Sequence, residues 1–507
     1  MIRLVRRAAA VALALIAAPA AADWREASTD HFLIYADAGE GWVKDYATRL
    51  ERFASALQRL QPKGWAGGGS INRVVIYVLP SVEDVQALAG GRSVGGFYKP
   101  RIGSSVIFTP MGSRLSRDGL TPITTLQHEY THHFLLSTAR SGYPFWYSEG
   151  FAELFGTARV QPNGTVEIGH PAEHRAYNLF NGSMKIEQLF APPKKFDGDV
   201  LYGRAWLLAH MLTFDPARSG QVERYVALIN AGKPSLDAAR EAFGDLNVLQ
   251  KQMTAYASRQ LTYSVMPADM TKVGPIALRT LTAGEAAMMP VRLRSDNGVT
   301  PETAGALVTD ARRRAAPYPG DAGAQVALAE AEFDAGHLDE AAAAADRALA
   351  ADPKSREAML YKGRVLMQRA AAPDATDPKR WQEARRWFVR ANRLEPDAPE
   401  PLALYYTSYL KAGEKPPEAA IVGLERAFEL SPHAVELRML VARQYLTEGD
   451  VKTARVVLSP LAIDHHGATD KGLARRMIEA IDAGRPASDV LATPAVVPDD
   501  SGAAAKS

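Results

Sequence analysis

The chain has 507 residues, of which 47% are hydrophobic and 23% charged, a balance typical of soluble globular proteins. This length exceeds what one core organises, and roughly 150 residues per domain predicts two to four structural units. The formal net charge is +2 at pH 7, and three of the cations lie within the first seven residues, so the rest of the chain is nearly neutral. Such a balance argues against nucleic acid as a partner.

The first 22 residues have the pattern of a secretory signal peptide. A basic start is followed by an apolar run from Ala8 to Ala18 and by small residues that end at Ala22. This run is shorter than the roughly 20 residues that span a bilayer, and no later stretch is apolar enough, so we expect cleavage near Ala22 and no membrane span afterwards. The chain has no cysteine, which excludes disulfides and thiolate ligands. We expect a bacterial protein that is periplasmic or secreted.

Residues 23–275 have the strand and helix patterns of a mixed α+β domain. Runs of β-branched and aromatic residues that end in turn residues predict strands at His31–Asp37, Arg73–Pro80 and Ser104–Pro110. Apolar residues at helical spacing predict helices at Trp42–Leu60, Pro122–Ser137, Tyr147–Phe155 and Asp199–Leu212. The periodicity fades over Arg259–Pro275, so we place a domain boundary at residue 275.

The segment LQHEYTHHFLLS, residues 126–137, carries the clearest chemistry. His128 and His132 are four residues apart, so on a helix both imidazoles project from one face. Glu129 lies beside them, where its carboxylate can reach a metal-bound water. Two imidazoles, one carboxylate and one water are the usual ligands of a catalytic Zn²⁺, which lowers the pKa of its water to about 7. The spacing therefore predicts a zinc site.

A second acidic segment, PFWYSEGFAELFG, follows the histidines and completes a more specific pattern. Sixteen residues separate Glu149 from His132, and Glu153 lies one helical turn further on. Together, HEYTH and WYSEGFAEL resemble the gluzincin metallopeptidases, the superfamily of thermolysin and the aminopeptidase N-like enzymes. The resemblance implies that His128, His132 and Glu149 bind Zn²⁺. It also implies that Glu129 is the general base, and that Glu153 hydrogen-bonds a zinc-binding histidine, here His128.

The resemblance also points to a tyrosine on a later helix. LYGRAWLLAHML is similar to the helix that carries the catalytic tyrosine of aminopeptidase N-like enzymes, which makes Tyr202 the candidate for stabilising the oxyanion of the intermediate. A role for Tyr202 in the core fits the same pattern equally well, and His210 and Tyr147 are weaker alternatives. His133 lies about 100° round the helix from His132, so we expect it to pack or to face solvent.

The segment upstream of the histidines bears on the kind of peptidase. Aminopeptidases of the superfamily carry a G-x-M-E-N segment that binds the free amine of the substrate, and this sequence has none. SSVIFTP, residues 104–110, offers backbone with which an extended peptide could pair, but no acidic anchor. An endopeptidase is therefore expected rather than an exopeptidase.

Beyond residue 275 the sequence has a different pattern, in which small residues recur in three copies that each end in a proline. The copies contain Ala329, Gly336, Ala341, Ala348 and Pro353; Ala384, Phe388, Ala391 and Pro396; and Ala420, Leu424, Ala427 and Pro432. The prolines recur at intervals near the 34 residues of the tetratricopeptide repeat, with an insertion at APDATDPKR. The sequence thus resembles a tetratricopeptide array over residues 321–484. Residues 276–320 form a helical connector or degenerate repeat, and residues 485–507 a disordered tail.

These patterns predict a gluzincin-like α+β metallopeptidase domain followed by an all-α tetratricopeptide solenoid. The leading hypothesis is an exported zinc metallopeptidase that cleaves a peptide or protein substrate and binds a protein partner through its repeats. The main alternative is a scaffold or adaptor protein whose metal domain is vestigial. A zinc hydrolase of a non-protein amide, such as a cell-wall peptide bridge, would have the same site.

Overall fold

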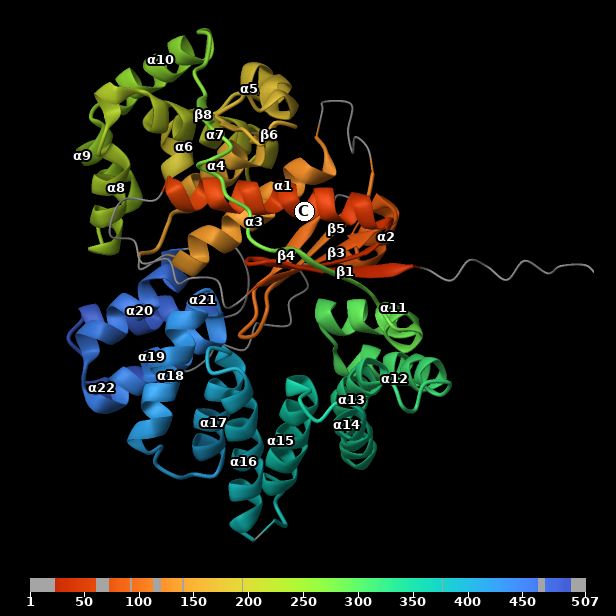
Figure 1. Cartoon of the computed structure of the whole chain (residues 1–507). Coiled ribbons are helices and arrows are strands. Elements are labelled where there is room, and N and C mark those ends of the chain that lie inside the picture. The colour runs from red at the N-terminus through yellow and green to blue at the C-terminus, as the bar shows by residue number, and fades with distance from the viewer. Residues whose placement is uncertain are drawn as a thin grey trace, which may run out of the picture.

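The computed structural model describes residues 23–60, 73–91, 94–112, 120–138, 141–193, 195–375, 377–463 and 470–493. An α+β region is followed by stacked helix pairs, as the sequence predicts, and Figure 1 shows these pairs gathered on one side of the amino-terminal region. The predicted signal peptide, residues 1–22, lies outside the described residues. Among the helices that are described, none combines the length and apolar character needed to cross a membrane.

A mixed six-stranded sheet organises the amino-terminal region, with the strand order β4-β5-β3-β2-β1-β9. The strands are β1 (Trp24–Ser28), β2 (Phe32–Asp37), β3 (Val74–Leu79), β4 (Phe97–Lys99), β5 (Val106–Pro110) and β9 (Ala277–Thr280). The central strands β2, β3 and β5 are parallel, β4 and β1 flank them in antiparallel orientation, and β9 pairs antiparallel with β1. Helices α1 (Glu40–Arg59) and α2 (Val82–Ala89) lie in the crossovers that parallel strands need.

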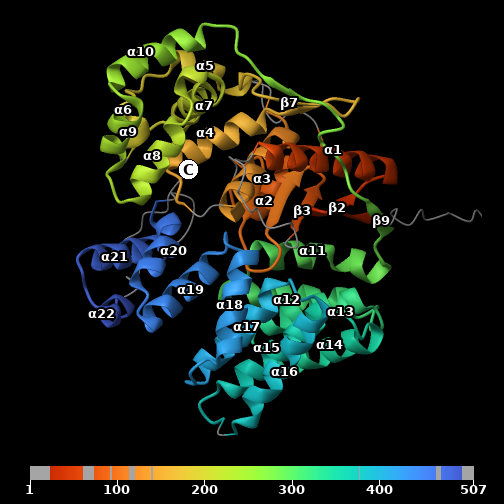
Figure 2. The same cartoon turned by 60° about the vertical axis from the view of Figure 1, so that its left-hand side comes forward.

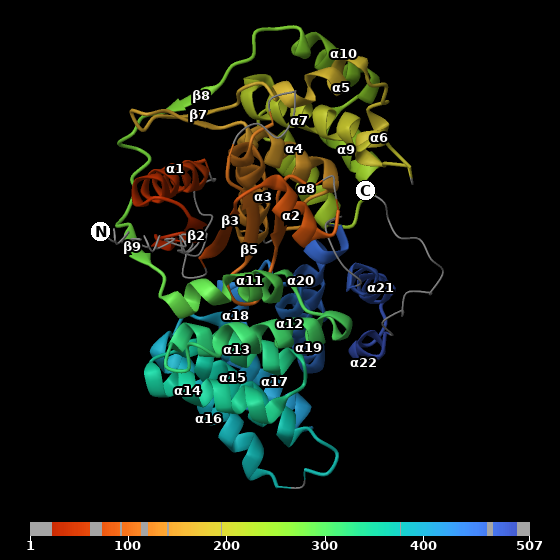
Figure 3. The same cartoon turned by 90° about the vertical axis from the view of Figure 1, so that its right-hand side faces the viewer.

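Both faces of the sheet are buried at the central strands β3 and β5, which explains why these strands are nearly continuous apolar runs. Side chains alternate between the faces along a strand, so Ile34 and Ile76 belong to the main core, while Tyr35 and Tyr77 belong to a second cluster. The main core includes apolar residues of α1 and of α3 (Pro122–Thr138). Met289 of α11 (Ala283–Asn297) joins the second cluster, and Figure 3 shows α11 lying across this face of the sheet.

Helices dominate the chain after β5. Helix α3 packs against α4 (Phe145–Gly156), and α4 packs against α7 (Gly198–Phe214). Around them lie α5 (Ala176–Asn181), α6 (Glu187–Phe190), α8 (Gln221–Asn230), α9 (Ser235–Phe243), α10 (Leu246–Ala257), the 3₁₀ turns Glu173–Arg175 and Pro216–Arg218, and a small sheet of β6 (Arg159–Val160), β7 (Val166–Ile168) and β8 (Ser264–Met266). The predicted helix boundaries are thus correct to within a few residues.

The carboxyl-terminal half consists of antiparallel helix pairs that stack in sequence (Figure 2). After α11 come α12 (Pro301–Ala315), α13 (Ala322–Asp334), α14 (Leu338–Ala351), α15 (Arg356–Ala370), α16 (Lys379–Leu394), α17 (Pro399–Lys411), α18 (Glu418–Leu430), α19 (Val435–Glu448), α20 (Val451–Ile463), α21 (Asp470–Asp482) and α22 (Ala487–Leu491). The small residues of the repeat pattern, such as Ala329, Ala384 and Ala420, are fully buried where the helices meet. Gly336 adopts a φ of +77° in the turn between α13 and α14, a conformation that glycine accepts without strain.

The structure departs from the predicted domain plan at two places. Strand β9 and helix α11 lie beyond residue 275, yet β9 extends the sheet and α11 covers one of its faces, so residues 277–297 complete the amino-terminal region. The periodicity of so short a strand is too weak to reveal this pairing. At the other end, residues 487–491 of the predicted disordered tail form α22, which buries Val490 against the array.

Candidate metal centre

Helices α3 and α4 bring the three predicted zinc ligands together. The Nε2 atoms of His128 and His132 are 3.1 Å apart. Oε2 of Glu149 lies 3.4 Å from His128 Nε2 and 3.6 Å from His132 Nε2. Glu149 is fully buried, and His132 nearly so. The residues therefore form a compact group that could hold a metal ion.

The spacing of these atoms can be compared with that of a zinc site. Bonds of about 2.1 Å at tetrahedral angles place the ligand atoms about 3.4 Å apart, and the three distances fall on both sides of this value. Two imidazoles and a carboxylate are also a ligand set that Zn²⁺ uses in catalytic sites. The residues present thus fit a zinc ion in both chemistry and spacing.

The second nitrogen of each imidazole faces a different partner. His132 Nδ1 lies 3.3 Å from Ser148 Oγ, a contact that orients the ring so that Nε2 faces the group. His128 Nδ1 lies 3.8 Å from Glu153 Oε1, which is longer than the predicted hydrogen bond. The carboxylate of Glu153 is instead bound by Arg175, whose Nε and Nη2 donate to Oε1 at 3.0 and 2.6 Å, and by His174, whose Nε2 lies 2.8 Å from Oε2.

Acidic residues determine the electrostatics of the centre. Burial alone would lower the pKa of His128, but the carboxylates of Glu149, Glu153 and Glu129 raise it to about 9. Burial would likewise raise the pKa of Glu153, yet His174, Arg175 and His128 lower it to about 2. The carboxylates near His128 thus provide negative potential at the group, which favours a cation there.

Tyr202 lies beside this group on α7. Its ring centroid is 6.5 Å from that of His128, and the guanidinium carbon of Arg175 lies 4.9 Å from the ring centroid. Burial and the nearby charges of Glu149, Glu153 and Glu129 raise the pKa of Tyr202 well above its usual value, although Arg175 opposes them, so its hydroxyl stays protonated. The structure thus brings Tyr202 to the site, and its catalytic role remains a prediction.

The other candidates from the sequence lie elsewhere. His210 directs Nδ1 to the hydroxyl of Tyr256 and Nε2 to the carbonyl of Gly169. The ring of Tyr147 packs against the rings of Tyr143, Trp146 and Phe151. His133 is buried, so of the two predicted surroundings, packing or solvent, it has the first. Its Nδ1 lies 2.9 Å from the Tyr98 hydroxyl.

Close packing of helices fixes the distance between the ligands. A Cβ atom on Gly150 would lie 2.3 Å from the carbonyl oxygen of Ala205, so α4 and α7 touch at a point where only glycine fits. Where α4 passes α3, a Cβ atom on Gly156 would lie 3.3 Å from the Cβ of His128. Trp146 packs against aromatic rings of α6, α8 and α9 rather than against α3, and its indole donates to Tyr225.

The strand that was expected to pair with a substrate is internal. Strand β5, which contains most of SSVIFTP, is paired with β3 on one side and β4 on the other, so its backbone is already used. The sheet ends at β4 on the side of β5, where β4 packs against α3, and at β9 on the other side. An extended peptide that added a strand next to α3 would therefore pair with β4.

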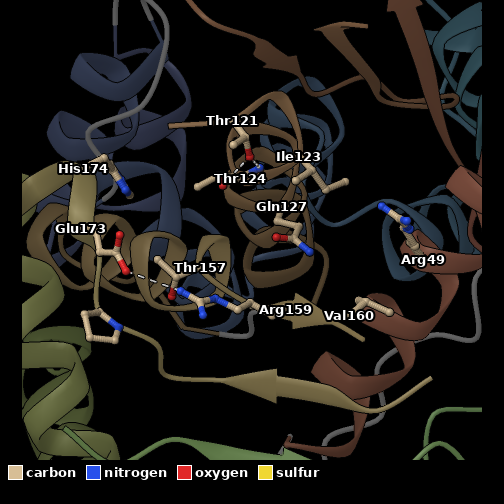
Figure 4. Close-up of a pocket in the computed structure, with 12 residues that line it drawn as sticks. Arg49, Thr121, Ile123, Thr124, Gln127, Thr157, Arg159, Val160, Glu173 and His174 are labelled. Atoms are coloured by element: carbon tan, nitrogen blue, oxygen red, sulfur yellow. Dashed lines mark hydrogen bonds and ion pairs between the residues drawn. The ribbon is translucent and has the colours of Figure 1, made fainter. Parts of the chain in front are cut away.

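A cavity of about 340 Å³ borders the site on the side of Glu153 (Figure 4). It is lined by residues of the first turns of α3, including Thr121 and Thr124, by Arg49 and Arg159, and by His174, which binds Glu153. The three candidate ligands do not line it. The cavity is thus separate from the space that a metal would occupy.

Sequence reasoning missed Ser148, His174 and Arg175. Ser148 directly precedes Glu149, so its position was open to inspection, although no motif marks it. His174 and Arg175 lie in a 3₁₀ turn more than 20 residues after Glu153, and no local pattern links them to it. Their contact depends on the tertiary fold.

Comparisons with known proteins identify the carboxyl-terminal half. The tetratricopeptide repeat family model matches residues 322–365, which cover α13, α14 and part of α15. Among solved structures, PilF of Pseudomonas aeruginosa is 17% identical at a TM-score of 0.32, over 41% of this chain and 87% of PilF. A thermophilic TPR protein of Thermus thermophilus, TTC0263, is 18% identical at a TM-score of 0.32, over 40% of this chain and all of that protein. No curated protein matches the chain.

Proposed function

We propose that the protein is a zinc-dependent peptidase whose metal ligands are His128, His132 and Glu149. The observation that carries this proposal is the spacing of their three ligand atoms, 3.1–3.6 Å, beside the value of about 3.4 Å for a tetrahedral zinc site. When bound, Zn²⁺ would supply a Lewis acid and a water with a pKa near 7. The predicted signal peptide would place this activity in the periplasm or outside the cell.

The residues of the chain would divide the proton transfers between them. Glu129 would accept the proton of the attacking water and return it to the leaving amine. Its charge acts on His128, Tyr202 and Tyr98, which supports a position close to the candidate ligands. Tyr202 would donate its hydroxyl proton in a hydrogen bond to the oxyanion, and its raised pKa favours a donor that keeps its proton.

Paired variants of the purified protein test this function. We expect one zinc per wild-type chain by inductively coupled plasma mass spectrometry, and hydrolysis of members of a degenerate peptide library. The Glu129→Gln variant should retain zinc and lose at least about a hundredfold in kcat, which is the low end for loss of a general base. The Glu149→Ala variant should lose zinc. Glu241→Gln, the same change at an exposed ion pair on α9, is the matched control and should alter neither property.

A second candidate is an interaction scaffold that works through the repeats. The tetratricopeptide match supports protein–protein interaction, and it favours this candidate more directly than it favours hydrolysis. The wild-type protein separates the two. Hydrolysis that stops with a chelator and returns with zinc supports a peptidase, whereas full zinc occupancy without cleavage of any library peptide would leave the scaffold.

A further inference from the structure

The loop between β4 and β5 reaches into the repeat array. Arg101 Nη1 donates to Asp296 Oδ1 at 2.6 Å, and Nη2 donates to the carbonyls of Ser295 and Asp296 at 3.0 and 2.7 Å, all at the end of α11. The next residue, Ile102, packs against the core of the later repeats. A Cβ atom on Gly103 would lie 3.3 Å from the Glu400 carboxylate of α17. This short loop thus lies between α11, which belongs to the amino-terminal region, and the array from α17 onward.

The backbone of this loop is held by the turn between α18 and α19. The Arg101 carbonyl lies 3.2 Å from His433 Nε2 and 3.3 Å from Ser431 Oγ, both of which can donate to it. His433 also packs edge-on against His133 of α3, with ring centroids 4.8 Å apart. His133 in turn lies next to the ligand His132 and bonds Tyr98 of β4. One turn of the array therefore contacts both the β4–β5 loop and the helix that carries two of the candidate ligands.

A third contact lies on the connection between α3 and α4. Gly142 and Asn230 bind each other through two hydrogen bonds, Gly142 N–H to Asn230 Oδ1 at 2.8 Å and Asn230 Nδ2 to the Gly142 carbonyl at 2.9 Å. Helix α20 covers both, since Arg455 Nη1 donates to the Asn230 carbonyl at 3.1 Å and a Cβ atom on Gly142 would lie 2.7 Å from Ile463. Figures 1 and 2 show α20 beside α8.

These contacts lie between the second and the third candidate ligand along the chain. His133 follows the two histidines, and Gly142 precedes Glu149 in the connection to α4. Because a packed interface resists displacement, an array that touches both places restricts how far α3 and the start of α4 can move apart. An array that served only as a free arm for outside partners would not need buried polar contacts of this kind with its own domain.

We infer that the repeat array docks in cis on the amino-terminal region of the same chain and clamps α3 and the α3–α4 connection in the positions where His128, His132 and Glu149 converge. The partner of the turn at Ser431–His433 is therefore the chain's own Arg101 loop, and outside proteins bind other surfaces of the array. The inference rests on the metal site of the proposed function, but not on peptide hydrolysis.

Two variants of the full-length protein test the clamp. Arg101→Ala removes the ion pair that holds the β4–β5 loop on Asp296 of α11, and His433→Ala removes the contacts of the array with the Arg101 carbonyl and His133. Arg426→Ala is the matched control, because its ion pairs with Asp397 and Glu429 lie within the array. The readouts are amide hydrogen exchange of the metal-free proteins, and zinc affinity by competition with a chelator.

We expect peptides from α3 and from residues 141–144 to exchange about tenfold faster in both interface variants than in wild type and the control. The dissociation constant for zinc should rise about tenfold, at the low end of the range for groups that orient ligands. Wild-type exchange in α3 in both variants would overturn the clamp, whatever the metal affinity. If the wild type binds no zinc at all, the proposed function fails, and the exchange experiment still decides whether the array clamps α3.

Discussion

A truncation at the predicted boundary should unfold the amino-terminal region. A fragment of residues 23–275 lacks β9, which pairs with β1, and α11, which covers the second face of the sheet. The apolar side chains that this face would expose are Trp24, Tyr35, Val75, Tyr77, Val106 and Phe108, all of them buried in the whole chain. A fragment of residues 23–316 keeps β9, α11 and α12 and is the natural comparison.

The size of the effect follows from the burial of these six side chains. Full burial of a large apolar side chain contributes roughly 2 kcal/mol, so exposing about half of each would cost about 6 kcal/mol in total. Typical domains have a free energy of unfolding of about 5–15 kcal/mol, and the lost pairing of β9 adds to the deficit. We therefore expect the shorter fragment to be largely unfolded and the longer one to remain folded.

Circular dichroism and thermal unfolding distinguish these outcomes. The shorter fragment should lack near-ultraviolet signals from its packed aromatic residues and should bind a dye for exposed apolar surface. The longer fragment should show a cooperative transition. A shorter fragment that unfolds cooperatively at the temperature of the longer one would refute the assignment of β9 and α11 to the amino-terminal core.

Two further predictions concern single residues. Gly150→Ala places a Cβ atom 2.3 Å from the Ala205 carbonyl and should destabilise the protein by about 2–3 kcal/mol and lower its zinc content. The control Gly305→Ala, in open space on α12, should stabilise the protein by up to about 1 kcal/mol. Urea unfolding measures both changes, and equal effects of the two variants would contradict the packing argument. Burial, with Arg438 nearby, lowers the pKa of His433 to about 4 despite its bond to the Arg101 carbonyl, while the unfolded chain titrates near 6.5. Between pH 4 and pH 6.5 the unfolded state therefore binds one proton more than the folded state. Protonation at His433 should lower the free energy of unfolding by at most about 3 kcal/mol as the pH falls from 6.5 to 4. His433→Gln should reduce this slope in urea titrations, while the buried His133, whose pKa burial also lowers, keeps its own share; an unchanged slope would show that other groups cause it.

The candidate ligands could be picked out from the sequence because their spacing within each helix is local. A spacing of four residues puts His128 and His132 on one face of a helix whatever the rest of the chain does. Glu149 and Glu153 have the same spacing on the next helix. The distance between the two helices is not local, since it depends on contacts such as that of Gly156 of α4 with His128 of α3, and no periodicity predicts it.

Glu153 shows where a local pattern misleads. The resemblance assigned its carboxylate to His128, at the right position on the helix. Arg175 and His174, which come from a distant turn, bind its two oxygens at shorter distances. Arg175 brings two nitrogens to Oε1 and His174 one to Oε2, so both oxygens have nearer partners than His128 Nδ1.

His133 is a second residue whose surroundings local sequence does not determine. Helical geometry correctly places it off the face of His132 and His128, which leaves packing or solvent as its surroundings. The choice between these two depends on His433, which lies 300 residues further along the chain and meets it only because the array folds back onto α3. The repeat pattern predicts the array but not its docking site, because the residues that repeat are those that pack helix against helix, while the contacts at Arg101, His433 and Arg455 occur once each. Contacts that occur once have no period, so only the folded chain reveals them.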